Sequence, residues 1–434
     1  MMTSTNKITY RGLAVWLVCA LFFMYEFLLR TVLGTFQSPL MSQLHLTPIT
    51  FALLSSTAYQ LIYGLMQLPV GLITERYGLK KTLFTAVIFC VIADAGFALA
   101  PTFWVAVLFR TLMGLGSSFG FVCLLVTVYD WMPRKNVALF IGLSQFIGTL
   151  GPMMAAGPLD ALSENAAVSW RAVFGYLAVI GLVIAILVLF IVDRNKQNRK
   201  KRVVLMRPSS VSGTLLQLVR QKQIWFIAIF SACVYFSLEY LSENECKAFL
   251  MSKGFSAHFS AYMITIAWLG YAVGCALLGF ISDKIQRRKV LMLNSAVMAL
   301  IALTSIIYLP LGESMTAVSF LLLGVGTSGQ SIGFAIMAEQ CKESYIAVGL
   351  GFNNAMIVLF SAIIAPLIGF ILSQLEVHHP LSTLVNHQRA FMVMIALLIT
   401  AVILTRFFIK ETFCKSMQDN IRLVTEKYTY TQRI

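Results

Sequence analysis

Two ionisable residues, Glu26 and Arg30, interrupt an otherwise apolar stretch at residues 16–36. This stretch is about as long as a helix needs to cross a lipid bilayer. Charged groups are costly in hydrocarbon and usually face a protein interior or a water-filled cavity. Their four-residue spacing places both side chains on one helical face, with the acid preceding the base, which is the favourable order. We therefore expect this face to line the path of a solute.

Each member of this pair has a chemical role that fits such a path. Arg30 can hold a carboxylate or phosphate through two parallel hydrogen bonds. Glu26 can hold Arg30 ready for that anion or carry a coupling proton. The alternative is a structural ion pair that only fixes this helix against its neighbours.

The composition defines the setting of this helix. Of the 434 residues, 59% are hydrophobic and only 12% are charged, whereas about a quarter are charged in a soluble domain. Repeated alternating ten-residue segments are missing from the sequence, so we expect an all-α membrane protein rather than a barrel. The net charge of +15 would suit a nucleic-acid partner, but the basic residues cluster in loops between apolar segments, as the positive-inside rule describes. We therefore expect the lipid bilayer, and no nucleic acid, as a partner.

We count twelve apolar segments of spanning length. They cover residues 12–36, 49–73, 81–100, 103–130, 137–160, 171–192, 223–250, 259–282, 289–310, 315–339, 346–374 and 389–410. The gap at 193–222 holds nine Lys or Arg residues and one acid, which places it and both termini in the cytoplasm. The predicted organisation is a six-helix bundle at 1–192, a basic linker at 193–222, a second bundle at 223–410 and a cytoplasmic tail at 411–434.

The two halves of the chain repeat each other in three places, in the same order. Residues 71–81 are echoed by 279–289, residues 112–121 by 322–334, and Arg171 by Arg389, each about 210 residues apart. Two related six-helix halves predict a solute site between them, near the middle of the membrane.

The repeated segments resemble signatures of the major facilitator superfamily. Residues 71–81 read GLITERYGLKK and resemble its G-x-L-a-D-R-x-G-R-K loop between helices 2 and 3, with Glu75 in place of the usual Asp. Residues 110–116 read RTLMGLG and resemble its R-x-x-x-G-x-G signature in helix 4. The resemblance implies a twelve-helix fold of two pseudo-symmetric bundles. It also implies transport of a small solute by rocking of those bundles, without naming the solute.

The resemblance also implies a conformational switch at the cytoplasmic ends of the helices. Contacts between its carboxylates and cations would latch the outward-facing state. The alternative is that these are loop charges ordered only by lipid headgroups. The residues involved would be Glu75, Arg76, Lys80, Asp130, Asp283, Arg287 and Glu339.

Further candidates for the solute path come from other helices. By the repeat offset, Glu239 falls opposite the first helix, nearly level with Arg30, as a proton carrier or gate partner. Glu243, Glu245 and Lys247 are expected in a solvated outer rim, with Glu243 at the mouth as a further proton-coupling or gating group. Residues 25–30 resemble the helix 1 Tyr/Arg region of organic-anion carriers. The polar residues that complete the predicted lining are Tyr25, Gln145, Tyr235, Asn353 and Asn354.

Asp94 and Arg110 are predicted to form a structural ion pair. They lie seven residues before and nine residues after Pro101, and antiparallel helices rising about 1.5 Å per residue would bring them to similar depth.

Enzyme chemistry and cofactors find no support in the sequence. His378, His379 and His387 are expected in a solvated external loop rather than at a metal site. Without a Walker loop, transport would be driven by an ion gradient. We expect a monomeric, proton-linked importer of an organic anion or zwitterion, such as a carboxylate, amino acid or siderophore, in a bacterial-type inner membrane. A weak Gly/Pro resemblance at 148–157 to drug exporters leaves proton-coupled export of amphiphiles open, and a non-transporting sensor on the same scaffold is a third reading.

Overall fold

The computed structural model describes residues 8–133, 137–165, 168–192, 211–341, 346–378 and 383–415, and this part of the chain is helical without strands. The first half contains α1 (Tyr10–Thr35), α2 (Gln37–Gln43), α3 (Pro48–Ala52), the π-helical turn η1 (Leu53–Thr57), α4 (Ala58–Tyr77), α5 (Leu79–Ala98), α6 (Phe103–Ser117), α7 (Gly120–Trp131), α8 (Val137–Ala155), α9 (Gly157–Asn165) and α10 (Trp170–Ile191). The second half contains α12 (Val211–Val219), α13 (Lys222–Glu243), α14 (Cys246–Ser252), α15 (Ala257–Ile285), α16 (Arg288–Tyr308), α17 (Glu313–Thr327), α18 (Gln330–Gln340), α19 (Ile346–His378), α20 (Thr383–Ala390), α21 (Met392–Ile403) and η4 (Leu404–Phe408).

The helices reproduce the predicted spans. Within the described ranges, eleven helical segments are long and apolar enough to cross a membrane. α8, with 19 residues, lies where the fifth predicted span was expected. Several spans are built from more than one piece: α3, η1 and α4 form the second, and α6 and α7 the fourth. The prediction of an all-α membrane protein is confirmed. Of the predicted linker, residues 211–219 form α12 and 193–210 lie outside the described part, as do 416–434 of the tail.

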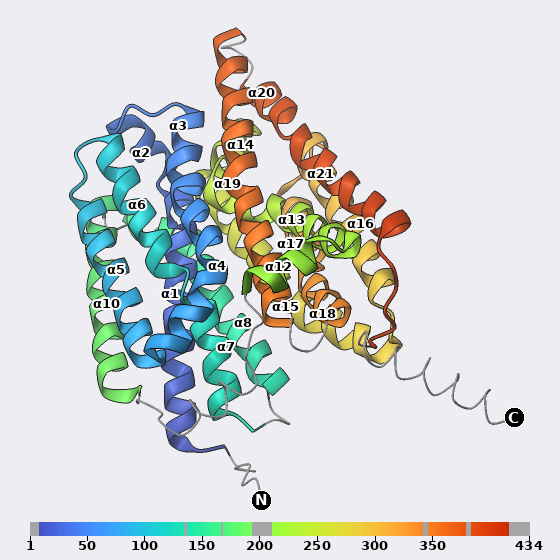
Figure 1. The fold of residues 1–434 in the computed structure, drawn as a ribbon. Coiled ribbons are helices and arrows are strands. Elements are labelled where there is room, and N and C mark those ends of the chain that lie inside the picture. Colours follow the sequence, from blue (N-terminus) through green and yellow to red (C-terminus); the bar gives the residue numbers. More distant parts are fainter. Residues whose placement is uncertain are drawn as a thin grey trace, which may run out of the picture.

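The two halves form two bundles side by side, the first in blue to green and the second in yellow-green to red (Figure 1). Within the first bundle α1 packs on α7, α8 and α10, and within the second α13 packs on α18, α19 and α21. The bundles are joined by helix pairings that include α3 and α4 with α19, α8 and α9 with α15, and α1 with α13. The short helices α2, α3, α14 and α20 lie at the end of the molecule opposite both termini (Figure 1).

Equivalent glycines in the two halves allow equivalent close helix contacts. A Cβ atom on Gly114 of α6 would come within 2.2 Å of the Tyr59 carbonyl oxygen in α4. A Cβ atom on Gly324 of α17 would come within 1.9 Å of the Ala267 carbonyl oxygen in α15. Only glycine permits such an approach of one backbone to another. The repeat in the sequence therefore corresponds to the same close helix contact in both halves.

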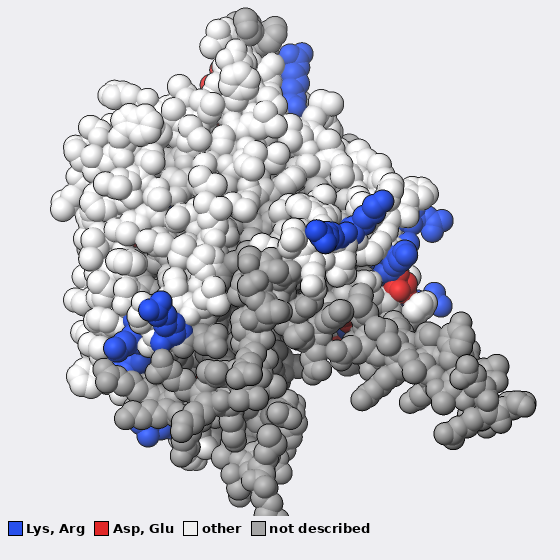
Figure 2. All heavy atoms as spheres, in the orientation of Figure 1, with Lys and Arg blue, Asp and Glu red and all other residues white. Residues whose placement is uncertain are grey.

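Charged side chains are few on the broad outer face of the molecule (Figure 2). Figure 2 shows a broad face with few charged residues, and its Lys and Arg side chains lie at the lower left, along the right side and near the top. A broad surface with few charges suits a bilayer, because charges are excluded from hydrocarbon.

Candidate functional site

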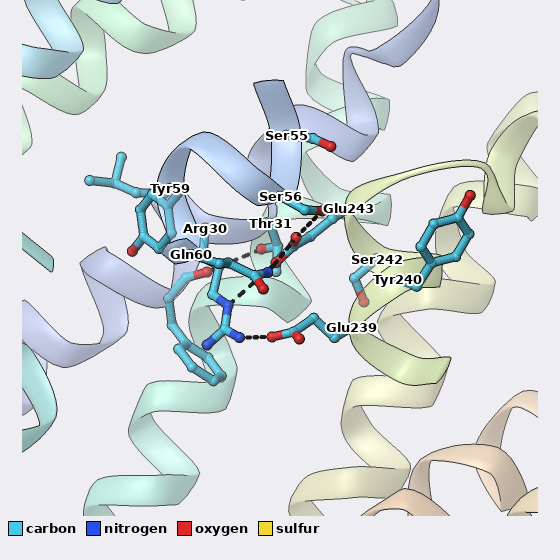
Figure 3. Close-up of polar contacts among 12 residues, drawn as sticks. Arg30, Thr31, Ser55, Ser56, Tyr59, Gln60, Glu239, Tyr240, Ser242 and Glu243 are labelled. Atoms are coloured by element: carbon cyan, nitrogen blue, oxygen red, sulfur yellow. Dashed lines mark hydrogen bonds and ion pairs between the residues drawn. The ribbon is translucent and has the colours of Figure 1, made fainter. Parts of the chain in front are cut away.

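Arg30 reaches from α1 across to α13 in the other bundle (Figure 3). Its guanidinium forms an ion pair with Glu239, and its Nε lies 3.3 Å from Oε1 of Glu243. The exposed fractions of the three residues are 4%, 1% and 0%. Glu239 and Glu243 are one helical turn apart, so two carboxylates share one guanidinium between the bundles.

The two carboxylates are held differently. Glu243 accepts a hydrogen bond from Ser56 Oγ at 2.8 Å, and Gln60 Nε2 donates to its two oxygens at 2.9 and 2.7 Å. Ser56 and Gln60 come from η1 and α4 of the first bundle. Within the described residues, neither oxygen of Glu239 has a hydrogen-bond donor apart from its ion-pair contact with Arg30. Glu243 is anchored on several groups, whereas Glu239 depends on Arg30 alone.

Aromatic rings surround this cluster. The Arg30 guanidinium lies 5.5 Å from the centre of the Phe27 ring and 5.8 Å from that of Tyr63, within cation–π range. Tyr235, one turn before Glu239, packs on Trp268 and Tyr271 of α15 at ring distances of 6.2 and 5.6 Å. An anion at Arg30 would therefore meet flat apolar surfaces.

Polar groups from four helices lie near these rings. Tyr271 donates to Gln330 Oε1 at 2.6 Å. Asn354 Nδ2 of α19 donates to Gln67 Oε1 of α4 at 2.8 Å, which makes a second polar link between the bundles. Amide groups of this kind bind solute hydroxyls, because each amide both donates and accepts.

Glu26 does not join the cluster. Tyr59 donates to the Glu26 carbonyl oxygen at 3.0 Å and to its Oε2 at 3.2 Å. Gly120, at the start of α7, leaves room for this carboxylate, because a Cβ atom there would lie 3.0 Å from Oε1. Arg30 therefore contacts the other bundle and Glu26 contacts its own, and the expectation that both line the path of a solute stays a prediction.

The predicted Asp94–Arg110 ion pair does not form. Tyr25 donates its hydroxyl to Asp94 and to the Leu177 carbonyl oxygen, the latter at 3.1 Å. Arg110 instead donates to three backbone carbonyl oxygens, on Leu29 at 2.6 Å, Arg30 at 2.7 Å and Ser55 at 2.9 Å. Tyr25 therefore points into its own bundle and does not line the path, and Arg110 holds α1 and the start of η1 together.

The other residues predicted to line the solute path differ in position and burial. Tyr235 and Asn354 lie in the interface as described. Asn353 is fully buried, and its amide has no hydrogen-bond partner among the described residues. Gln145 is half-buried on α8.

The outer rim that the sequence predicted is buried instead. Glu243 and Glu245 have exposed fractions of 0% and 5%. His387, predicted in a solvated loop, is buried in α20, with Nε2 3.5 Å from a carboxylate oxygen of Glu245. The side chain of His378 and the whole of His379 lie outside the described part of the chain. The reason is closure: Ser55 donates to Asn244 Oδ1 at 2.6 Å and Lys247 pairs with Asp160, so the bundles meet at the end away from the termini.

The predicted switch residues show contacts within the second half. Arg288 donates to Asp283 at 2.6 Å and to Glu339 at 2.9 Å. The prediction named Arg287, which is exposed, whereas its neighbour Arg288 makes these contacts.

In the first half, Lys80 donates to the Leu189 carbonyl oxygen at 2.5 Å. The Arg76 guanidinium lies 5.4 Å from the Tyr77 ring centre, and Asp130 is half-buried. The side chain of Glu75 lies outside the described part.

Sequence reasoning missed the groups on the second span that meet the acidic pair. Ser56, Gln60, Tyr63 and Gln67 recur at spacings of four, three and four residues within an apolar segment. This is the period of one helical face, and the polar row was the available signal.

Comparisons with known proteins agree with this architecture. The family model described as Major Facilitator Superfamily matches residues 16–329 and, again, 247–416. In solved structures, a bacterial homologue of the human lysosomal transporter Spinster, in an inward-facing and unoccupied conformation, aligns with a TM-score of 0.73 at 16% identity, covering 92% of this chain and 97% of that chain. A D-xylose–proton symporter aligns with a TM-score of 0.75 at 14% identity, covering 93% and 99%.

The buried polar cluster around Arg30 lies between the two bundles, where the sequence predicts a solute site. The chain belongs to the major facilitator superfamily, as the signature loops indicated. A hexuronate transporter of Bacillus subtilis (strain 168) is 24% identical over 236 residues, which is 54% of this chain and 55% of that protein.

Proposed function

We propose that this transporter carries a small organic anion or zwitterion into the cell together with a proton. The membrane would be a bacterial-type inner membrane, with both termini in the cytoplasm. The observation that carries the proposal is the sharing of Arg30 by two carboxylates, of which only Glu243 has other donors.

This arrangement couples the binding of a proton at Glu239 to the binding of an anion at Arg30. Glu239 without its proton occupies the guanidinium and competes with a substrate carboxylate. Once Glu239 takes a proton, the attraction between its neutral carboxyl and Arg30 is weak. Arg30 can then bind the substrate carboxylate through two parallel hydrogen bonds. When the substrate leaves, Glu239 loses its proton and pairs with Arg30 again.

The surroundings of Arg30 favour a hydroxylated carboxylate. Amide groups on Gln67, Asn354 and Gln330 offer partners for hydroxyls, and the Tyr235 and Trp268 rings offer flat apolar faces. The similarity to a hexuronate transporter supports this class, because a hexuronate is a sugar that carries a carboxylate.

The test is solute-induced proton movement in liposomes that contain the purified protein and a pH-sensitive dye. Hexuronates, hydroxy acids and amino acids are added as separate pools, and a cationic dye is added in a parallel arm. We expect the lumen to become more acidic with at least one anionic or zwitterionic pool.

Two outcomes would overturn the proposal. Movement of the cationic dye with proton counterflow, without any response to the anions, identifies an exporter. Saturable binding of a pool without movement of solute or protons identifies a sensor.

A further inference from the structure

A separate cavity lies at the edge of the second bundle, where η4 ends and α16 begins. Its volume is about 330 Å³, and its lining includes Arg287, Lys289, Val290, Arg406, Glu411 and Phe413. In Figure 2, basic side chains surround an acidic one at the right edge, where Figure 1 shows the chain running from the end of α21 towards the start of α16.

The acid in this cavity is already engaged. Glu411 Oε1 accepts from the backbone N–H of Arg288 at 2.9 Å, and its Oε2 accepts from that of Lys289 at 2.9 Å. The side chains of Arg287, Lys289 and Arg406 have no hydrogen-bond or ion-pair partner in the described ranges. Three cations therefore remain for an external anion.

The cavity also has an apolar side. Phe413 and Val290 have exposed fractions of 52% and 39%, and Phe407, just before the cavity in sequence, is 73% exposed. Two spanning segments, Arg288–Tyr308 and Thr383–Phe408, end at this level. The cations therefore lie at the boundary of the hydrocarbon, beside an apolar surface.

The equivalent loop in the described part of the first half, residues 79–81, has one cation fewer than residues 287–289. The repeat places Leu79 where the second half has Arg287, and Lys80 is engaged with the Leu189 carbonyl oxygen. If these basic residues served only to orient the chain in the membrane, Arg287 would not need to be present in the second half alone.

We propose that this cavity binds the phosphate headgroup of an anionic membrane lipid, with an acyl chain against Phe413 and Phe407. Arginine pairs suit phosphate geometry, and basic pockets between helices on the cytoplasmic side suit such headgroups. A free phosphate ion shares the headgroup chemistry but would gain nothing from the aromatic surface.

The test is native mass spectrometry of the full-length protein in detergent, titrated with phosphatidylglycerol or phosphatidylcholine. The double variant Arg287→Gln/Arg406→Gln is compared with Lys80→Gln/Lys81→Gln, which removes two cations from the equivalent loop. We expect selective binding of phosphatidylglycerol, weakened at least about tenfold in the first variant and unchanged in the second. Arg287→Leu, which installs the residue type of the first half, should give part of the loss.

Equal phosphatidylglycerol binding by wild type and both double variants would overturn the proposal, as would equal binding of the two lipids. Displacement of phosphatidylglycerol by millimolar inorganic phosphate would show that the cavity takes free phosphate, and would also overturn the lipid assignment.

Discussion

Gly34 of α1 lies directly against Ser242 of α13, at the end of the molecule where the two bundles meet. A Cβ atom on Gly34 would come within 2.1 Å of the Ser242 carbonyl oxygen. Because the obstacle is backbone, a side-chain rotation cannot relieve this contact. Closure of the bundles at this end therefore requires glycine at position 34.

We predict that Gly34→Ala separates the bundles at this end. Spin labels on cysteines introduced at the exposed positions Ser42 and Val377 would report the separation, and their distance should increase. Gly175→Ala is the matched control, since a Cβ atom there meets no atom within 4 Å. An unchanged distance distribution in Gly34→Ala would contradict the closed arrangement described here.

The Tyr25–Asp94 contact tests whether Tyr25 stabilises the first bundle or lines the path of the solute. Removing the hydroxyl in Tyr25→Phe leaves the buried Asp94 carboxylate without this donor, which should cost about 1–3 kcal/mol. The measurement is the thermal unfolding midpoint in detergent, which should fall while the apparent affinity for solute stays the same. A normal midpoint with an altered affinity would instead restore Tyr25 to the substrate path.

Glu239 and Glu243 should differ in their effect on proton coupling. Glu239→Gln removes the carboxylate that competes with the solute for Arg30, so exchange of solute across the membrane should persist while proton-driven accumulation falls about tenfold or more. Glu243→Gln should keep coupling, because Ser56 and Gln60 rather than a proton hold that group, and should weaken contact between the bundles. Counterflow and proton-driven uptake of the same carboxylate pools separate these effects. Loss of coupling in Glu243→Gln alone would reverse the assignment.

The architecture could be predicted because its signals are local. Each span is visible in its own hydropathy, and the repeated loops relate the halves without reference to packing. The same offset brought Glu239 opposite Arg30. The depth of a residue in the membrane follows from counting along a helix, and counting sufficed for this pair.

Rotation about a helix axis could not be predicted in the same way. Asp94 and Arg110 have compatible depths, yet Asp94 faces Tyr25 and Arg110 faces backbone carbonyl oxygens. The helices that carry them are apolar on nearly all sides, so the polar pattern gives little information on which face meets which neighbour. Burial of Glu243 was missed for another reason. It results from closure between bundles, which is a property of the conformation rather than of one helix.

The central claim is that Arg30 binds the carboxylate of the transported solute. The most direct measurement is proton influx driven by the carboxylate pools in liposomes, compared among wild type, Arg30→Gln, Arg30→Lys and Arg171→Gln. Arg171 is a matched cation that donates to the Ala98 and Ala100 carbonyl oxygens within the first bundle. Size-exclusion profiles and unfolding midpoints establish that each variant is folded.

We expect Arg30→Gln to abolish the influx and Arg30→Lys to weaken the apparent affinity, because an ammonium group cannot bind a carboxylate through two parallel hydrogen bonds. Arg171→Gln should transport normally. Influx in a folded Arg30→Gln protein with the apparent affinity of wild type would show that the carboxylate binds elsewhere.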